Sequence, residues 1–407
     1  MQCFAASFFS LEPDSSDAGG LAAESLQRQF GSERLKAVIV YATMNHDHTE
    51  LLEALRAKLP DDVLLLGSSA QGVVGDGELA EEGMVAGAIG LGGEALRCAA
   101  ALEREIQVQP FEKGSALAKR LKDDLGVEPT LVIVYYDPLS GVDVETLIAG
   151  MRTVLTCELV GGGSGQPWGR PLGTAQFWGT EVLEHGVLAI ALSGPFAVEV
   201  GICHGTAPTG LSSVVTKAEG NQVLEIDGRP AVEIWREVTG CSASDLLHQS
   251  HFATWAVGVE RCARVQGPNG VEELTGRVIR GAFGFNTETG AMILQAAVPV
   301  GTKIMLHHRT VEDVLNGTIA MGTDLAQRLH DRRPWAVLGF ECAARTFPFL
   351  GPIKTREEHH GLRQAVAPTA PWLGMMMWGE IGPCVGQTAF HNYTYPLVVL
   401  VDAPLQK

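Results

Sequence analysis

The sequence has few cationic side chains and no long apolar run. Its 30 lysine and arginine residues stand against 47 aspartate and glutamate residues, which gives a formal net charge of −17 and a pI near 5.1. Such a surface repels nucleic acid and anionic membranes, so we expect neither as a partner. The most apolar stretch, residues 186–198, contains Pro195 and is shorter than the ~20 residues that a membrane-spanning helix needs.

Signals for secretion and for metal binding are also missing. The chain does not open with a basic segment and a long apolar run, so we expect a cytoplasmic protein without a secretory signal. The eight cysteines form no CxxC motif, which predicts free thiols in a reducing compartment. Closely spaced histidines occur without HExxH spacing or a carboxylate cluster, so we expect no metal site. These histidines are His46 with His48, His307 with His308, and His359 with His360.

The length and the pattern of the first half indicate an α/β fold. A chain of 407 residues with 46% hydrophobic residues is long enough for two domains. Short apolar strands alternate with helical patterns, as in the strand 38–41, the helix from about Thr49 and the strand 63–66. This order is typical of parallel strands joined by crossover helices. Turn residues at 183–186 and 193–195 suit β-hairpins.

The second half begins with a clearly bounded helix. Pro230 precedes its apolar residues and Gly240 follows them, which is the usual asymmetry of proline and glycine at helix ends. Thr310, followed three residues later by Asp313, predicts the start of a long helix. Apolar runs predict further buried strands here, among them 335–340.

These patterns together predict the fold class and the division of the chain. We expect an α/β protein of mixed α+β character, with mixed β-sheets flanked by helices. We place the two domains at residues 1–220 and 221–407.

Two segments rich in small residues follow predicted strands of the first half. Gly162 and Ser164 belong to a run of glycines whose backbone N–H groups could line a pocket, although the run lacks the spacing of known phosphate-binding loops. Ser68 and Ser69 lie at the carboxyl end of a strand, where open α/β sheets bind ligands. For the glycine run we favour a tight turn whose backbone lines a pocket over nucleotide binding, and for Ser68 and Ser69 a capped turn is an equally good explanation.

Cys342 and Arg345 follow the strand 335–340. The guanidinium could lower the pKa of the thiol and make it a nucleophile, but no histidine lies nearby in sequence as a base. We therefore favour an Arg345 that binds a ligand carboxylate or pairs with Glu380. On this interpretation an Arg345→Ala variant folds but loses stabilisation by the ligand. The apolar residues 375–378 could line a pocket or pack in the core.

Several ordered motifs resemble those of the FIST family. The segments 160–165, 184–194 and 204–216, with the earlier segment 67–72, are similar to the FIST N-terminal domain. The segments 340–345, 378–382 and 390–394 resemble the hallmarks of the FIST C-terminal domain. The segment Ser69–Gly72 departs from the family, which often has a small residue, a glycine and an acid there.

The resemblance implies an intracellular sensory module that binds a small ligand such as an amino acid, acts through a separate partner, and is not an enzyme. Some family members are haem-containing nitric oxide sensors that regulate histidine kinases or cyclic-di-GMP enzymes, so such an enzyme is an expected partner. We expect no cofactor; if haem binds instead, its candidate ligands are His204 and His391. A second alternative is a hydrolase that uses Cys342. The candidate ligand-binding residues are Ser68, Ser69, Gly162, Ser164, Cys342, Arg345, Gly379, Glu380, His391 and Asn392.

Overall fold

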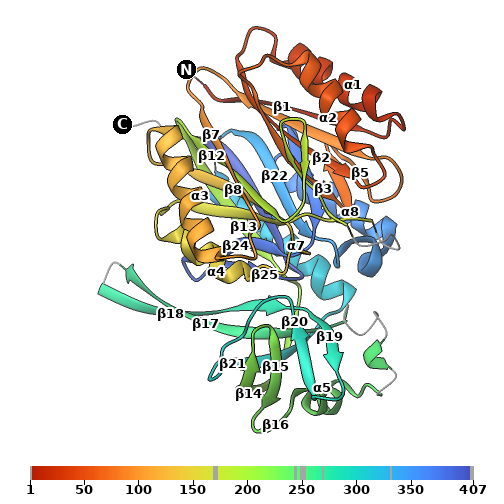
Figure 1. Cartoon of the computed structure of the whole chain (residues 1–407), viewed down its shortest axis with the longest axis vertical. Helices are drawn as coiled ribbons and strands as arrows, with labels where there is room; N and C mark the ends of the chain where they lie inside the picture. Colours follow the sequence, from red (N-terminus) through yellow and green to blue (C-terminus); the bar gives the residue numbers. More distant parts are fainter. Residues whose placement is uncertain are drawn as a thin grey trace.

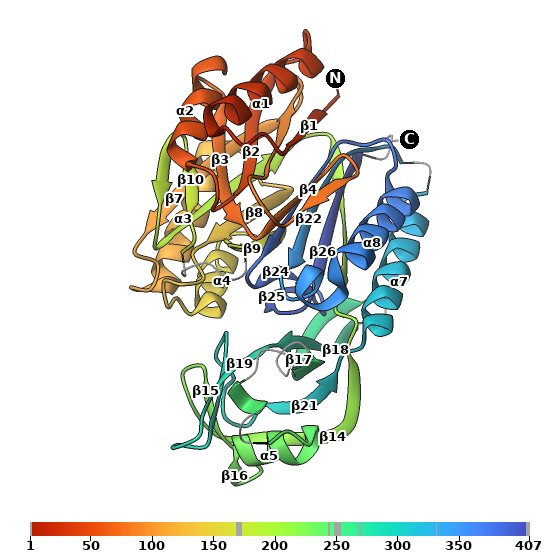
Figure 2. The ribbon, with the colours of Figure 1, turned by 90° about the vertical axis from the view of Figure 1, so that its right-hand side faces the viewer.

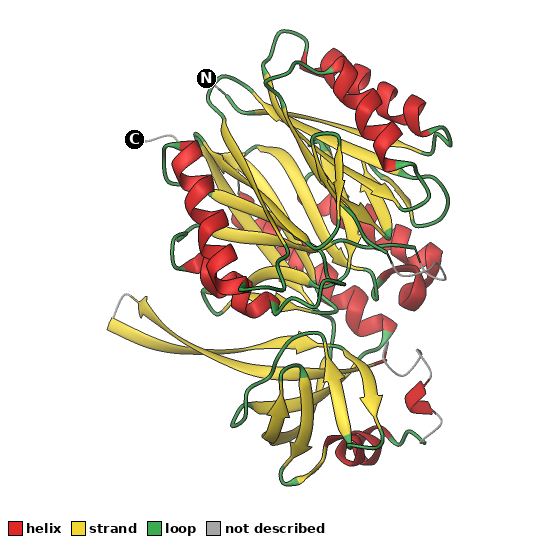
Figure 3. Cartoon of the chain, viewed as in Figure 1, coloured by secondary structure: helices red, strands yellow, loops and turns green. Residues whose placement is uncertain are grey.

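The computed structural model describes residues 2–167, 173–242, 245–247, 254–267, 270–330 and 332–403. A large body of three six-stranded sheets carries helices on its outer faces, and a smaller, mainly β body lies below it (Figures 1 and 3). The predicted α/β fold class, with mixed sheets and two domains, is confirmed. Among the described residues, no helix combines the length and the apolar character that crossing a membrane requires.

The large body contains three repeats with the same order of elements: strand, helix, strand, helix, strand, hairpin, strand. The first repeat consists of β1 (Phe4–Ser10), α1 (Ser15–Phe30), β2 (Leu35–Thr43), α2 (His48–Lys58), β3 (Leu64–Ala70), the hairpin β4 (Gly72–Gly75) and β5 (Glu78–Ala80), and β6 (Ala86–Gly92). The second consists of β7 (Arg97–Arg104), α3 (Pro110–Leu125), β8 (Leu131–Tyr136), α4 (Val144–Arg152), β9 (Glu158–Gly163), the hairpin β10 (Gln176–Trp178) and β11 (Glu181–Leu183), and β12 (Gly186–Ser193).

The third repeat is interrupted by the smaller body, which lies between its first strand and its first helix. It consists of β13 (Phe196–Cys203), α7 (Val311–Leu329), β22 (Pro334–Cys342), α8 (Gly351–Val366), β23 (Trp372–Met377), the hairpin β24 (Glu380–Cys384) and β25 (Gln387–His391), and β26 (Tyr395–Asp402). Helices α7 and α8 lie side by side on the outer face of this sheet (Figure 2).

Each repeat gives its hairpin to the sheet of another repeat. The three strand orders are β1-β6-β2-β3-β10-β11, β7-β12-β8-β9-β24-β25 and β13-β26-β22-β23-β4-β5. Strands from the ranges 1–220 and 221–407 therefore lie in the same sheets. A boundary near residue 220 divides the sequence, but it does not separate the large body into two parts. The hairpins predicted at 183–186 and 193–195 are wrong because the strands on either side of each turn belong to different sheets.

The exchanged strands cross near the centre of the large body, where three backbone hydrogen bonds form a closed cycle between the repeats. These bonds run from Gln71 N to Met376 O (2.9 Å), from Gly165 N to Ser69 O (2.9 Å) and from Trp378 N to Gly163 O (3.1 Å). Each repeat donates one of them and accepts one, which is what a pseudo-threefold arrangement requires.

The core follows the same threefold pattern. Alternate residues of β2, β8 and β22 point inward because side chains of a strand alternate between its two faces. The inward residues are Ile39 and Tyr41, Ile133 and Tyr135, and Leu338 and Phe340, all completely buried in one apolar cluster. The hydroxyl groups of Tyr41 and Tyr135 form a hydrogen bond with each other at 2.5 Å, as buried polar groups require.

The outer edge strands β1, β7 and β13 are protected by side chains from the helix that follows each in its repeat. An outward carbonyl accepts a hydrogen bond from Gln29 Nε2 (to Ser7 O, 2.9 Å), from Arg120 Nη1 (to Leu102 O, 2.9 Å) or from Arg328 Nη2 (to Val200 O, 3.0 Å). A polar or cationic side chain on a strand edge hinders pairing with a further strand.

The smaller body is built from strands and one main helix. It consists of β14 (Ala207–Glu219), β15 (Gln222–Ile226), β16 (Arg229–Pro230), α5 (Ala231–Thr239), a short 3₁₀ turn (Asp245–Leu247), β17 (Trp255–Gly267), β18 (Gly270–Arg280), β19 (Ala282–Asn286), β20 (Ala291–Leu294) and β21 (Lys303–His308). Strands β17 and β18 form a long ribbon that extends below the large body (Figure 1).

Both helix starts predicted for the second half are confirmed. Pro230 is the N-cap of α5, and Gly240 ends this helix in the left-handed conformation that glycine tolerates (φ +70°). The hydroxyl of Thr310 accepts a hydrogen bond from Asp313 N at 3.0 Å at the start of α7.

Candidate functional site

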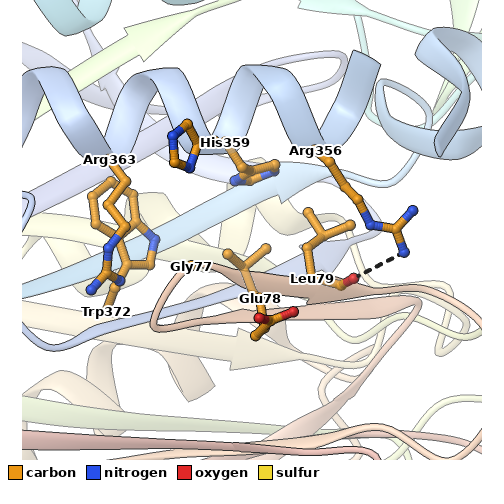
Figure 4. Close-up of a pocket in the computed structure, with 9 residues that line it drawn as sticks. Gly77, Glu78, Leu79, Arg356, His359, Arg363 and Trp372 are labelled. Carbon is orange, nitrogen blue, oxygen red and sulfur yellow. Dashed lines mark hydrogen bonds between the residues drawn. The ribbon is translucent and has the colours of Figure 1, made fainter. Parts of the chain in front are cut away.

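A cavity of about 180 Å³ lies between α8 and the hairpin β4–β5 (Figure 4). Its helix belongs to the third repeat and its hairpin to the first, so the cavity exists only because the hairpin is exchanged. Its lining residues are Val74, Gly77, Glu78, Leu79, Arg356, His359, His360, Arg363 and Trp372.

Helix α8 presents cationic side chains to this cavity. Arg356, His359 and Arg363 lie at intervals of three and four residues, which places them on one helix face. Arg356 Nη2 reaches Leu79 O at 3.4 Å (Figure 4). Arg363 Nη1 lies 3.7 Å from Asp76 Oδ1. Both contacts are longer than a good hydrogen bond. Arg356 also lies over the ring of Phe347, 5.5 Å from its centroid. The polar contacts of both guanidinium groups are therefore weak, which leaves N–H groups able to contact an anion.

A buried ionic network lies directly behind His359. His359 Nε2 contacts Glu341 Oε2 at 2.6 Å, and Arg345 reaches Glu341 Oε1 with Nε (3.2 Å) and Glu358 Oε1 with Nη2 (2.8 Å). Burial opposes the charge on Glu341, but His359 and Arg345 outweigh it and lower the pKa of this carboxyl. Burial likewise opposes the charge on His359, yet Glu341 outweighs it and raises the pKa of the imidazole. The network thus favours a cationic His359 in the cavity wall.

At the two equivalent helix–hairpin contacts, an aromatic side chain of the hairpin packs against apolar residues of the helix. Phe177 of the hairpin β10–β11 lies in the apolar cluster that contains Leu51 and Leu55 of α2. Phe390 of β24–β25 lies in the cluster that contains Leu147 and Ile148 of α4. The contact at α4 also carries charge, since the buried guanidinium of Arg280 pairs with Glu145 and lies 5.0 Å from the centroid of the Phe390 ring. At both of these positions an aromatic ring packs into the junction, whereas the junction at α8 contains a cavity lined by cationic side chains.

The structure brings the predicted residues of the first half together at the strand crossing. Ser68 Oγ donates to Ser164 Oγ at 2.6 Å, and Ser69 Oγ donates to Gly165 O at 2.8 Å. Gly162 pairs with Glu380 across β9 and β24. The three serine side chains are buried and already hydrogen-bonded, and they join the exchanged strands of different repeats.

Arg345 and Glu380 do not pair, contrary to one of the sequence-based interpretations. Arg345 is held by Glu341 and Glu358, and no ion pair joins it to Glu380 within the part of the chain that the structure describes. The carboxylate of Glu380 instead accepts hydrogen bonds from Thr394 Oγ1 (2.9 Å) and from the backbone N–H of Gly379 (3.2 Å). Both side chains are fully buried and neither lines the cavity.

The surroundings of Cys342 disfavour a nucleophilic thiol. Burial raises its pKa well above the usual range, and the neighbouring Glu380 adds to the rise. A reactive cysteine needs the opposite, because the thiolate is the attacking species. This environment argues against the alternative of a hydrolase that uses Cys342.

His391, Asn392 and His204 lie near the junction with the smaller body. Asn392 Oδ1 accepts from Gly281 N at 3.0 Å, and its Nδ2 donates to Gln295 Oε1 at 2.5 Å, so it fastens that body to β25. Burial lowers the pKa of His391 to about 3 and that of His204 to about 4, so both imidazoles are neutral.

Neither of these two histidines lines the cavity at α8. The cavity is also smaller than the ~300 Å³ at which pockets for drug-sized ligands begin. The residues of this cavity therefore do not fit a haem group.

Of the residues that line the cavity, sequence reasoning singled out only His359 and His360, and these only as possible metal ligands. Helix α8 was not predicted because charged side chains, Glu358 and His359, replace apolar ones on its buried face. The spacing of Arg356, His359 and Arg363 was the available signal, since it repeats with the period of a helix.

The burial of Glu380 predicts a pH-dependent stability. Its pKa is raised to about 8 by burial, so its contribution to stability is fully present below pH ~4.5 and is lost as the pH rises through 8. We expect the free energy of unfolding of the wild type, relative to Glu380→Gln, to fall by about 3 kcal/mol between pH 5 and 8. Urea denaturation at several pH values measures this change in the free energy of unfolding. The control variant is Glu53→Gln, at an exposed glutamate. Parallel pH profiles for wild type and Glu380→Gln would contradict the assignment.

Comparison with known proteins places the chain among bacterial relatives. A protein of Mycobacterium tuberculosis, strain CDC 1551, is 26% identical over 389 residues, which covers 95% of this chain and 96% of the relative. A protein of Mycobacterium bovis is 29% identical over 234 residues, which covers 56% of this chain and little more than half, 57%, of that relative. Both relatives are described as uncharacterised.

Similarity to solved structures is low. A cyanuric acid hydrolase from A. caulinodans overlaps 50% of this chain and 72% of its own, with a TM-score of 0.30 and 13% identity. A second structure, titled as cyanuric acid hydrolase, overlaps 76% of this chain and all of its own, with a TM-score of 0.29 and 11% identity. These values support no argument about fold or activity.

Family matches cover most of the sequence. The FIST N domain matches residues 36–229 and the FIST C domain matches residues 231–383. The order of the two matches is the one that the motifs indicated. The chain belongs to the FIST family, whose domains are sensory and associated with signalling.

Proposed function

We propose that this protein senses a small zwitterionic metabolite, such as an amino acid, in the cavity between α8 and the hairpin β4–β5. The observation that carries the proposal is the pair of weakly engaged guanidinium groups of Arg356 and Arg363, which face Glu78 across the cavity. A ligand carboxylate would pair with the arginines, and an ammonium group with Glu78.

The local charges favour a ligand without net charge. The cations Arg356, Arg363 and His359 are already accompanied by Asp76, Glu78 and Glu341. A simple anion would unbalance this set, whereas a zwitterion would leave it neutral. The volume agrees, because a cavity of 150 Å³ holds a molecule of about six heavy atoms, the size of a small amino acid.

The ligand-binding residues predicted from the sequence lie outside the cavity and hold the elements that form it. Arg345 positions His359 through their shared partner Glu341, rather than contacting the ligand itself. Ser68, Ser69, Ser164 and Gly162 hold the crossing strands from which the hairpins leave. In this proposal their roles, and those of Gly379, Glu380, Cys342, His391 and Asn392, are structural.

Substitution of the cavity arginines tests the proposal. We expect the wild type to gain thermal stability with at least one amino acid, because a ligand at 100 times its Kd adds about 2.7 kcal/mol to the native state. Arg356→Gln and Arg363→Gln should each lose most of this gain while folding normally. Arg34→Gln, which removes an exposed guanidinium paired with Asp62, is the matched control. An undiminished gain in both cavity variants would refute the site.

The output runs, in our proposal, through a separate protein such as a histidine kinase or a cyclic-di-GMP enzyme. This part rests on the family resemblance and is tested by adding the ligand to an isolated kinase with and without this protein. Haem sensing is the competing function, and an absorption spectrum decides between them. A Soret band in the purified protein, or after addition of haemin, would replace the metabolite proposal with a haem site elsewhere in the molecule.

A further inference from the structure

The residue that follows the hairpin β4–β5 is a buried carboxylate, Glu81, whose two oxygens hold different parts of the chain. Oε1 accepts from the backbone N–H of Phe347 at 2.9 Å, and Oε2 accepts from Gln71 Nε2 at 2.9 Å. Gln71 Nε2 also reaches Ala343 O at 3.1 Å. Glu81 thus joins the cavity hairpin to the turn between β22 and α8.

The second repeat has no equivalent of this contact among the described residues. The equivalent position after the hairpin β10–β11, one residue beyond the end of β11, is Glu184, whose side chain is exposed. Two of the repeats therefore carry a glutamate at this position, but only Glu81 is buried and bonded to another repeat. Burying a carboxylate costs free energy, which the hydrogen bonds from Phe347 N and Gln71 Nε2 offset here.

Phe347 lies in a short π-helical segment, Thr346–Leu350, which joins β22 to α8. Such segments are rare and are frequent at functional sites. At its far end, the ring of Phe349 lies against the guanidinium of Arg309, 4.4 Å from the ring centroid. The same guanidinium also contacts the ring of Tyr393 at 4.1 Å. The segment is thus hydrogen-bonded to Glu81 near one end and packs against Arg309 near the other.

Arg309 stands at the junction with the smaller body. It follows β21 directly, and its backbone N–H donates to Thr254 O at 2.7 Å, next to the start of β17. A displacement of Phe349 therefore acts at the point where β21, paired with β17, leads into α7 of the large body.

We propose that Glu81 and Arg309 make the segment Thr346–Leu350 a mechanical link between the cavity wall and the smaller body. Movement of the hairpin pulls on Phe347 through Glu81, and Phe349 passes the movement to Arg309 and the junction of β17 and β21. The smaller body is then the part of the molecule that responds. A role of this link in sensing rests on the proposed ligand site, whereas the mechanical link itself does not depend on that site.

Hydrogen exchange of the full chain without ligand tests the link. In Glu81→Gln, whose amide cannot accept from both Phe347 N and Gln71, we expect at least about tenfold faster exchange at the amides of Phe347 and of Arg309. Glu184→Gln is the matched control and should change neither amide. Faster exchange at Phe347 with an unchanged Arg309 would overturn the proposal, since the contact would then be local.

A second variant keeps the test decisive if Glu81→Gln does not fold. Phe349→Leu keeps an apolar side chain but removes the aromatic face from Arg309. We expect faster exchange at Arg309 with unchanged protection of the hairpin β4–β5, and no change at Arg309 would again overturn the link. Because no ligand is used, failure here leaves the metabolite site standing, and failure to bind amino acids leaves the link standing.

Discussion

Replacement of Arg345 by methionine is expected to lower the free energy of unfolding by about 3–5 kcal/mol. The guanidinium is completely buried between Glu341 and Glu358, so its removal leaves Glu358 in the interior without its ion-pair partner and Glu341 with His359 alone. A loss of this size is a large share of the total stability of an ordinary domain. Urea denaturation with matched m-values measures it.

The combined variant separates charge from packing. Glu341→Gln and Glu358→Gln, added to Arg345→Met, remove the stranded charges and should recover a substantial part of the loss. Arg34→Met, at an exposed ion pair, should cost less than about 1 kcal/mol. An Arg345→Met protein as stable as the wild type would refute the structural role. The sequence-based interpretation predicts instead that an Arg345 variant folds normally and only fails to bind the ligand.

Gly162→Ala is expected to destabilise the protein by about 3 kcal/mol or to prevent folding. An added Cβ at this position would lie 2.2 Å from Gly379 O and 2.5 Å from Met377 Sδ. The backbone of Gly379, between β23 and β24, stands in the way, so rotation of a side chain cannot relieve the contact. The yield of folded protein and its thermal midpoint measure the effect.

Gly173→Ala is the corresponding control. A Cβ there would meet nothing closer than the end of the Met44 side chain at 3.7 Å. We expect this variant to be within about 0.5 kcal/mol of the wild type. Equal behaviour of the two variants would show that the strands at the crossing are farther apart than described.

Local chemistry was sufficient to predict individual elements. Pro230 and Gly240 bound α5, and Thr310 caps α7, because caps depend on neighbours only a few residues away. The destination of each hairpin could not be predicted in this way. β4 and β23 pair across about 300 residues, and nothing in the four residues of β4 specifies that partner.

The candidate site could likewise be predicted only in part from the sequence. The motifs around Arg345 and Glu380 were visible because small and charged residues interrupt apolar strands there. Their contacts were not, since Glu358 comes from α8, a helix whose charged buried face hides its apolar period. The cavity itself joins two repeats, so only the folded chain shows it.

The exchange of hairpins has a consequence for the synthesis of the protein on the ribosome. β4 leaves the ribosome early, but its partner β23 follows only about 300 residues later, a wait on the order of 15–60 s at typical elongation rates. During that interval β4 is paired with β5 on one side only, and its open edge is a site for association with other chains. Cells that make this protein therefore need to shield the growing chain, and slower translation would lower the yield of folded product.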